Sequence, residues 1–130
     1  MLGIFSEYTD LYLWVAALST LLFFGLPLCL FPLRWAGWMH WKIPAHTHLT
    51  VYFGRCLGAV VCIMSLFALV AAKSDRIVCS FYYQFLLVNI AAMIALHLYG
   101  ALTKTQPITE TIEIAFWAVL FITTLCFYPV

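Results

Sequence analysis

A few ionisable side chains stand out in this otherwise apolar sequence. Arg55 lies in one apolar run, His97 lies in the next, and Glu110 and Glu113 begin the one after that. Asn89 falls on the same helical stripe as His97. A charged group in hydrocarbon costs at least about 2.5–3.5 kcal/mol and therefore needs a partner. We expect Arg55 to pair with Glu110 or Glu113, with His97 and Asn89 as hydrogen-bonding neighbours.

The same region also offers ligands for a metal ion. Imidazoles and carboxylates, the ligands that suit zinc or iron, come from His46, His48, His97, Glu110 and Glu113. The Glu-x-x-His spacing of carboxylate-bridged metal sites in helical bundles is absent. Arg55 in the same cluster would also oppose a bound cation. A b-type haem between His48 and His97 is a further alternative, so the sequence names no cofactor.

A third alternative is an anionic or amphiphilic ligand, such as a lipid headgroup or a quinone. It would enter from the membrane and meet Arg55, His97 and a glutamate, because arginine binds phosphate and carboxylate groups in a bidentate manner. Ser, Cys and Thr do not stand in a recognisable nucleophilic motif, and a glycine-rich phosphate loop is also lacking. The sequence therefore predicts a structural or ligand-binding cluster and no catalytic residue.

The composition indicates the environment in which this cluster lies. Of 130 residues, 66% are hydrophobic and 8% are charged, whereas soluble domains average about 45–50% and about 25%. These values exclude an ordinary soluble domain and an intrinsically disordered chain. A net charge of +1 also leaves no basic surface for nucleic acid. We expect an all-α integral membrane protein.

Four apolar runs are long enough to cross a bilayer, which takes about 20 helical residues. They cover residues 11–31, 51–72, 77–103 and 111–128. The connections at 73–76 and 104–109 are short, and short connections make consecutive helices antiparallel neighbours. The prediction is a single domain, residues 1–130, folded as an up-down bundle of four transmembrane helices.

The longer connection between the first two runs is rich in tryptophan. Trp35, Trp38 and Trp41 lie three residues apart between Arg34 and Lys42. Indole rings and cations favour the headgroup region, so this segment is expected to lie along the membrane surface as an interfacial anchor.

Two glycines in the second run, Gly54 and Gly58, are four residues apart. This spacing allows the backbone of another helix to approach closely, so we expect a helix-packing contact there.

The distribution of Lys and Arg residues predicts the orientation of the chain in the membrane. Four Lys and Arg residues fall on the side of the 34–50 and 104–109 connections, and two fall on the other side. Because cations are enriched on the cytoplasmic side, both termini are predicted to be non-cytoplasmic.

Two functions remain open at this stage. The first is a non-catalytic accessory or structural subunit that packs against other membrane subunits or against copies of itself. The alternative is a lipid-, quinone- or metal-binding enzyme or carrier that uses Arg55, His97, Glu110 and Glu113.

Overall fold

The computed structural model describes residues 2–130, and all regular secondary structure within that range is helical. Four helical segments are long and apolar enough to cross a membrane: Ser6–Leu30, His48–Ala71, Arg76–Thr103 and Ile108–Cys126. Each end lies within five residues of the predicted run. The predictions of an all-helical chain and of four such segments are confirmed.

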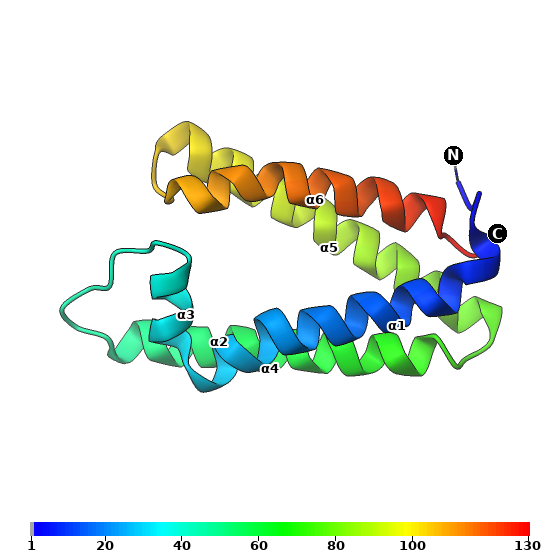
Figure 1. The fold of residues 1–130 in the computed structure, drawn as a ribbon, viewed down its shortest axis with the longest axis horizontal. Helices are drawn as coiled ribbons and strands as arrows, with labels where there is room; N and C mark the ends of the chain where they lie inside the picture. Colours follow the sequence, from blue (N-terminus) through cyan, green and yellow to red (C-terminus); the bar gives the residue numbers. More distant parts are fainter. Residues whose placement is uncertain (1) are drawn as a thin grey trace. The chain divides into compact units, whose positions relative to one another are not determined.

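The first of these segments is built from several short elements (Figure 1). A 3-10 turn, η1 (Ser6–Tyr8), leads into α1 (Thr9–Thr20), a π-helical turn η2 (Leu21–Gly25) and α2 (Leu26–Leu30). The short helix α3 (Pro32–Trp38) follows. The remaining three segments are single helices, α4 (His48–Ala71), α5 (Arg76–Thr103) and α6 (Ile108–Cys126).

Pro27 explains the change of winding in the first segment. Proline has no N–H group, so the carbonyl of Phe23 lacks the partner it would have in a regular α-helix. The N–H of Leu26 bonds to the carbonyl of Leu21, five residues earlier, as in a π-helix. The irregularity therefore lies in the turn before the proline.

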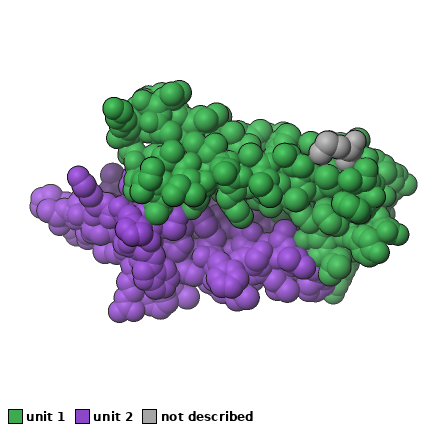
Figure 2. Space-filling model, turned by 45° about the horizontal axis from the view of Figure 1, so that its top comes forward, with its two compact units in different colours: residues 1–12, 71–130 green, residues 13–70 purple. Residues whose placement is uncertain are grey.

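The chain forms two compact units, which Figure 2 shows in different colours. The first contains residues 1–12 and 71–130, and the second contains residues 13–70. Their internal structures are described separately below.

In the unit of residues 13–70, α4 runs antiparallel to the α2–α3 segment at close range. Gly58 faces Cys29, and Gly54, one turn earlier, faces Pro32. A Cβ atom on Gly58 would lie 2.6 Å from the Cα of Cys29, and one on Gly54 would lie 2.6 Å from the Cβ of Pro32. The two backbones are therefore too close for any larger residue to fit without displacement.

In the unit of residues 1–12 and 71–130, α5 and α6 lie side by side and antiparallel (Figure 1). The N-terminal segment is bonded to the end of α6, because the N–H groups of Gly3 and Phe5 donate to the carbonyls of Leu125 and Cys126, each at 2.9 Å. These bonds satisfy carbonyls that the end of a helix leaves free.

Buried hydroxyl groups join the same elements. The fully buried Tyr83 of α5 donates its hydroxyl hydrogen to the carbonyl of Thr9 at 3.0 Å. Tyr12 and the fully buried Thr124 of α6 share a hydrogen bond of 2.7 Å between their hydroxyl groups. These contacts fix α1, α5 and α6 at one end of the unit.

At the other end, the chain turns sharply from α5 into α6. Lys104 takes a left-handed conformation with φ of 56°, and the N–H of Thr105 bonds to the carbonyl of Gly100 at 3.0 Å. Pro107, which cannot donate a backbone hydrogen bond, precedes the first residue of α6. This tight turn places the start of α6 against the last turns of α5.

Candidate functional site

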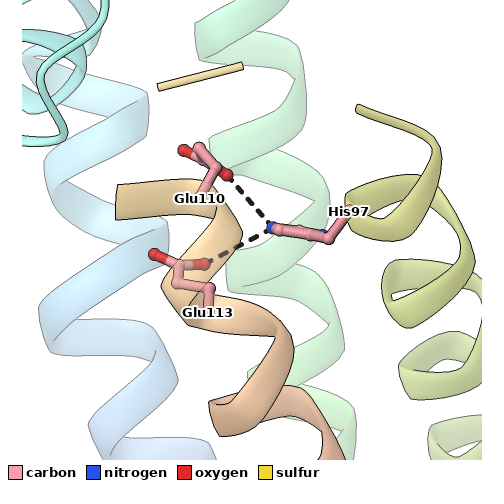
Figure 3. A group of neighbouring side chains, drawn as sticks. All are labelled: His97, Glu110 and Glu113. Carbon is pink, nitrogen blue, oxygen red and sulfur yellow. Dashed lines mark hydrogen bonds and ion pairs between the residues drawn. The ribbon is translucent and has the colours of Figure 1, made fainter. Parts of the chain in front are cut away.

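Three of the residues selected from the sequence meet at this turn. His97 projects from α5 toward Glu110 and Glu113, which both project from the first two turns of α6 (Figure 3). The imidazole Nε2 lies 3.1 Å from Oε2 of Glu110 and 3.6 Å from Oε2 of Glu113. Both carboxylates therefore face the same ring nitrogen. We call these three side chains the His–Glu–Glu cluster.

The other ring nitrogen of His97 has a partner on its own helix. Nδ1 lies 2.7 Å from the carbonyl oxygen of Met93, one turn earlier. A carbonyl oxygen only accepts hydrogen bonds, so Nδ1 carries a hydrogen. In the neutral imidazole, Nε2 then presents a lone pair to the two carboxylates.

The cluster is buried at the histidine and more open at the glutamates. The side chain of His97 is 7% exposed, that of Glu110 is 12% exposed and that of Glu113 is 25% exposed. The glutamates also lie near the start of a helix, where the partial positive charge of the backbone stabilises carboxylates. Glu113 is the most exposed of the three side chains.

Trp117 lies one helical turn after Glu113 and contacts the imidazole with a tilted ring. The ring centroids of Trp117 and His97 are 5.9 Å apart. The indole Nε1 is buried and lies near the Glu113 carboxylate without meeting hydrogen-bond geometry, so it has no hydrogen-bond partner among the described residues.

Gln106 holds the connection against both helices. Its side-chain amide donates to the carbonyl of His97 at 3.0 Å and to the hydroxyl of Thr111 at 3.1 Å. Gly100 leaves the room for this amide, because a Cβ at that position would lie 2.7 Å from the Cδ of Gln106. Sequence reasoning did not find Gln106, since one glutamine in a polar connection carries no distinguishing signal.

Two further residues, Asn89 and Arg55, were predicted to belong to the cluster. Asn89 is eight residues before His97 on α5, which corresponds to a rise of about 12 Å along the helix axis. The structure does not bring it to the His–Glu–Glu cluster. Arg55 lies on α4, in the unit of residues 13–70, and its ion pair with a glutamate stays a prediction.

Two predicted metal ligands also belong to the unit of residues 13–70. His46 is exposed in the irregular segment before α4, and His48 is the first residue of α4. Among the described residues, His97, Glu110 and Glu113 form the group whose ligand atoms lie within 4.8 Å of one another. Participation of His46 and His48 in a metal site stays a prediction.

The three tryptophans of the longer connection have different surroundings. Trp35, in α3, packs edge-on against Phe24 with ring centroids 4.8 Å apart. Trp38 at the end of α3 is 69% exposed, and Trp41 in the irregular segment is 38% exposed. Trp35 thus packs α3 against the π-helical turn η2, while the other two indoles are exposed.

Comparison of the chain with protein-family models, with curated proteins and with solved structures gave no match.

Proposed function

We propose that this chain is a multi-pass integral membrane protein that binds a divalent transition-metal ion at the His–Glu–Glu cluster. Support for the membrane location comes from the four helices of spanning length and from the many large apolar side chains that they expose. In this proposal the four segments form an up-down bundle, and the tryptophan-rich connection lies at the membrane surface with the cytoplasmic ends.

The observation that carries the metal proposal is the orientation of the His97 ring. Its Nδ1–H group is engaged by Met93, so in the neutral ring Nε2 and two carboxylate oxygens converge as three hydrogen-bond acceptors. Acceptors repel one another in a site of low polarity unless a proton or a cation lies between them. A histidine oriented through its second nitrogen by a carbonyl group is also the usual arrangement at metal sites.

Charge balance favours a divalent ion over a single proton. With a neutral imidazole and two ionised carboxylates, the cluster carries two negative charges, which a divalent ion neutralises. One proton on Nε2 would leave a net negative charge in a largely buried site, and such charges are costly in a membrane.

The two nitrogen–oxygen distances are close to those between the ligands of a zinc ion. Zinc binds imidazole nitrogen at about 2.0–2.1 Å and carboxylate oxygen at about 2.0–2.2 Å, so tetrahedral ligand atoms lie about 3.3–3.5 Å apart. The two nitrogen–oxygen distances of 3.1 Å and 3.6 Å lie on either side of this range. Three protein ligands leave one position for water or substrate, as at catalytic zinc sites.

Zinc titration of the purified protein tests the proposal. The chain is extracted in mild detergent, stripped with a chelator and titrated with Zn²⁺, and bound metal is measured by elemental analysis. We expect one ion per chain. Binding should be at least about tenfold weaker for His97→Gln, Glu110→Gln or Glu113→Gln, because even the loss of a residue that hydrogen-bonds to a metal ligand lowers the affinity about tenfold.

Glu7→Gln is the matched control, because it makes the same chemical change at an exposed residue of the same unit. Its zinc affinity should equal that of the unaltered protein. Equal affinities for Glu113→Gln and Glu7→Gln would refute the metal site. Release of the chain from membranes by alkaline carbonate would independently refute the membrane location.

A further inference from the structure

Acidic residues occur in only one of the two units. All five Asp and Glu residues lie at position 10 or before, or at position 75 or after. The unit of residues 13–70 therefore contains no carboxylate side chain, although it carries Arg34, Lys42 and Arg55. Its cations have no acidic side chain within their own unit to pair with.

Two of these cations lie in the connection between α2 and α4. Arg34 is exposed on α3, and Lys42 is exposed in the irregular segment that follows. His40 and His46, also exposed, lie in that segment as well. This stretch, residues 31–47, is a surface with positive charge and without negative charge. We call it the cationic connection.

The structure of the cationic connection is defined by contacts within its own unit. Pro32 is buried and lies against Gly54 of α4, and Trp35 packs against Phe24. His40 adopts a left-handed conformation with φ of 61°, which ends the helical stretch and turns the chain. Arg34 therefore projects from an anchored helix.

Apolar and cationic groups are exposed together on this surface. Trp38 is 69% exposed, Trp41 is 38% exposed and Ile43 is 43% exposed. The guanidinium carbon of Arg34 lies 5.8 Å from the centre of the Phe31 ring, which leaves the N–H groups at the edge of the guanidinium free to meet an acceptor. Indole rings beside cations are typical of segments that lie at the level of lipid headgroups.

We infer that the cationic connection binds anionic phospholipid, with Arg34 and Lys42 contacting the headgroup phosphate and Trp38 and Trp41 entering the interface. Charge complementarity carries this inference, because the surface has no carboxylate of its own to neutralise it. The inference rests on the membrane location proposed above, and it is independent of the metal site.

Lipid retention by the full chain tests the inference. The protein is reconstituted in nanodiscs of phosphatidylcholine with a minor share of phosphatidylglycerol, then released in mild detergent, and the retained lipid is measured by native mass spectrometry. We expect phosphatidylglycerol to be enriched over its share of the nanodisc. The Arg34→Gln/Lys42→Gln double variant should lose about thirtyfold in preference, because each cation near an anionic surface contributes a factor of about five.

The matched control is the Lys73→Gln/Lys104→Gln double variant, which removes the same charge from the other unit. It should retain the preference for phosphatidylglycerol. Equal losses in the two double variants would overturn the inference, and so would equal retention of both lipids by the unaltered protein. Displacement of the lipid by inorganic phosphate at similar concentration would assign the site to free phosphate and would also overturn it.

The failure of this inference is distinguishable from failure of the membrane proposal. A chain that resists carbonate extraction yet shows no lipid preference would contradict the lipid inference alone. A chain that carbonate releases would contradict both.

Discussion

The Nδ1 atom of His97 lies 2.7 Å from the main-chain oxygen of Met93 in the same helix. This bond fixes the position of one ring hydrogen and the orientation of the ring, so Nε2 is directed at the glutamates of α6. The partner is a backbone atom of a helix, so the orientation does not depend on a mobile side chain. A pre-oriented ligand loses little conformational freedom on binding.

We first predict that zinc stabilises the protein against unfolding. A ligand that binds only the folded state at 100 times its dissociation constant adds about 2.7 kcal/mol to the free energy of unfolding. The midpoint of thermal unfolding in detergent should therefore rise with zinc for the unaltered chain and for Glu7→Gln. It should rise clearly less for Glu113→Gln, because tenfold weaker binding removes about 1.3 kcal/mol of this gain. A rise of the same size in Glu113→Gln would place the zinc elsewhere.

A second prediction concerns the close approach at Gly58. The Gly58→Ala variant places a methyl group against the Cys29 backbone, which cannot rotate away as a side chain can. We expect a loss of about 1–3 kcal/mol in the free energy of unfolding, the usual cost of overpacking. Gly37→Ala is the control, because a Cβ there meets nothing within 4 Å. Equal unfolding midpoints for the two variants would contradict the close contact.

The buried hydroxyl of Tyr83 gives a third prediction. Tyr83→Phe removes the hydroxyl that donates to the Thr9 carbonyl, and a buried hydrogen bond of this kind contributes about 0.5–1.5 kcal/mol. Tyr99→Phe makes the same change on a side chain that is 67% exposed, and it should be nearly neutral. Thermal unfolding of both variants checks the difference, and a Tyr83→Phe variant as stable as Tyr99→Phe would contradict it.

The fourth prediction separates the metal site from the ion pair expected for Arg55. If a metal ion balances the glutamates, Arg55→Met and Glu113→Gln should destabilise additively, within about 0.5 kcal/mol. A buried ion pair would couple them instead, because removing one partner costs about 3–5 kcal/mol and leaves the other uncompensated. A double-mutant cycle on thermal stability in detergent decides between the two. Strong coupling would restore the ion pair as the better explanation.

Membrane topology gives a fifth prediction. Single cysteines introduced at Ser74 and Thr105, in a background without the native cysteines, should be labelled from opposite faces of the membrane. A third at Lys42 should be labelled from the same face as Thr105. These positions lie in the three connections between the proposed spans. Labelling of Ser74 and Thr105 from one face would contradict the up-down arrangement.

Much of the helical framework could be predicted from the sequence, because long apolar runs separated by short polar connections define it. The meeting of His97 with Glu110 and Glu113 also followed from such reasoning. His97 lies about two turns before the connection, and the glutamates lie just after it, so an antiparallel pair brings them to similar depth.

Other features could not be predicted, for identifiable reasons. The π-helical turn at Leu21–Gly25 depends on how backbone bonds rearrange before Pro27, and local composition does not specify that. Tyr83 and Thr124 lie in apolar runs, where their hydroxyl groups gave no sign of partners more than forty positions away. Gln106 became recognisable only when the turn placed its amide between two helices.

X-ray absorption spectroscopy at the zinc edge, on the loaded protein in detergent, tests the metal site most directly. The five cysteines are the competing ligands, and zinc–sulfur bonds of about 2.3 Å are easily told from zinc–nitrogen and zinc–oxygen bonds of about 2.0–2.2 Å. We predict one imidazole and the rest oxygen ligands, with no sulfur, and loss of the imidazole signal in His97→Gln. A sulfur shell, or a spectrum unchanged in His97→Gln, would contradict a metal ion held by His97, Glu110 and Glu113.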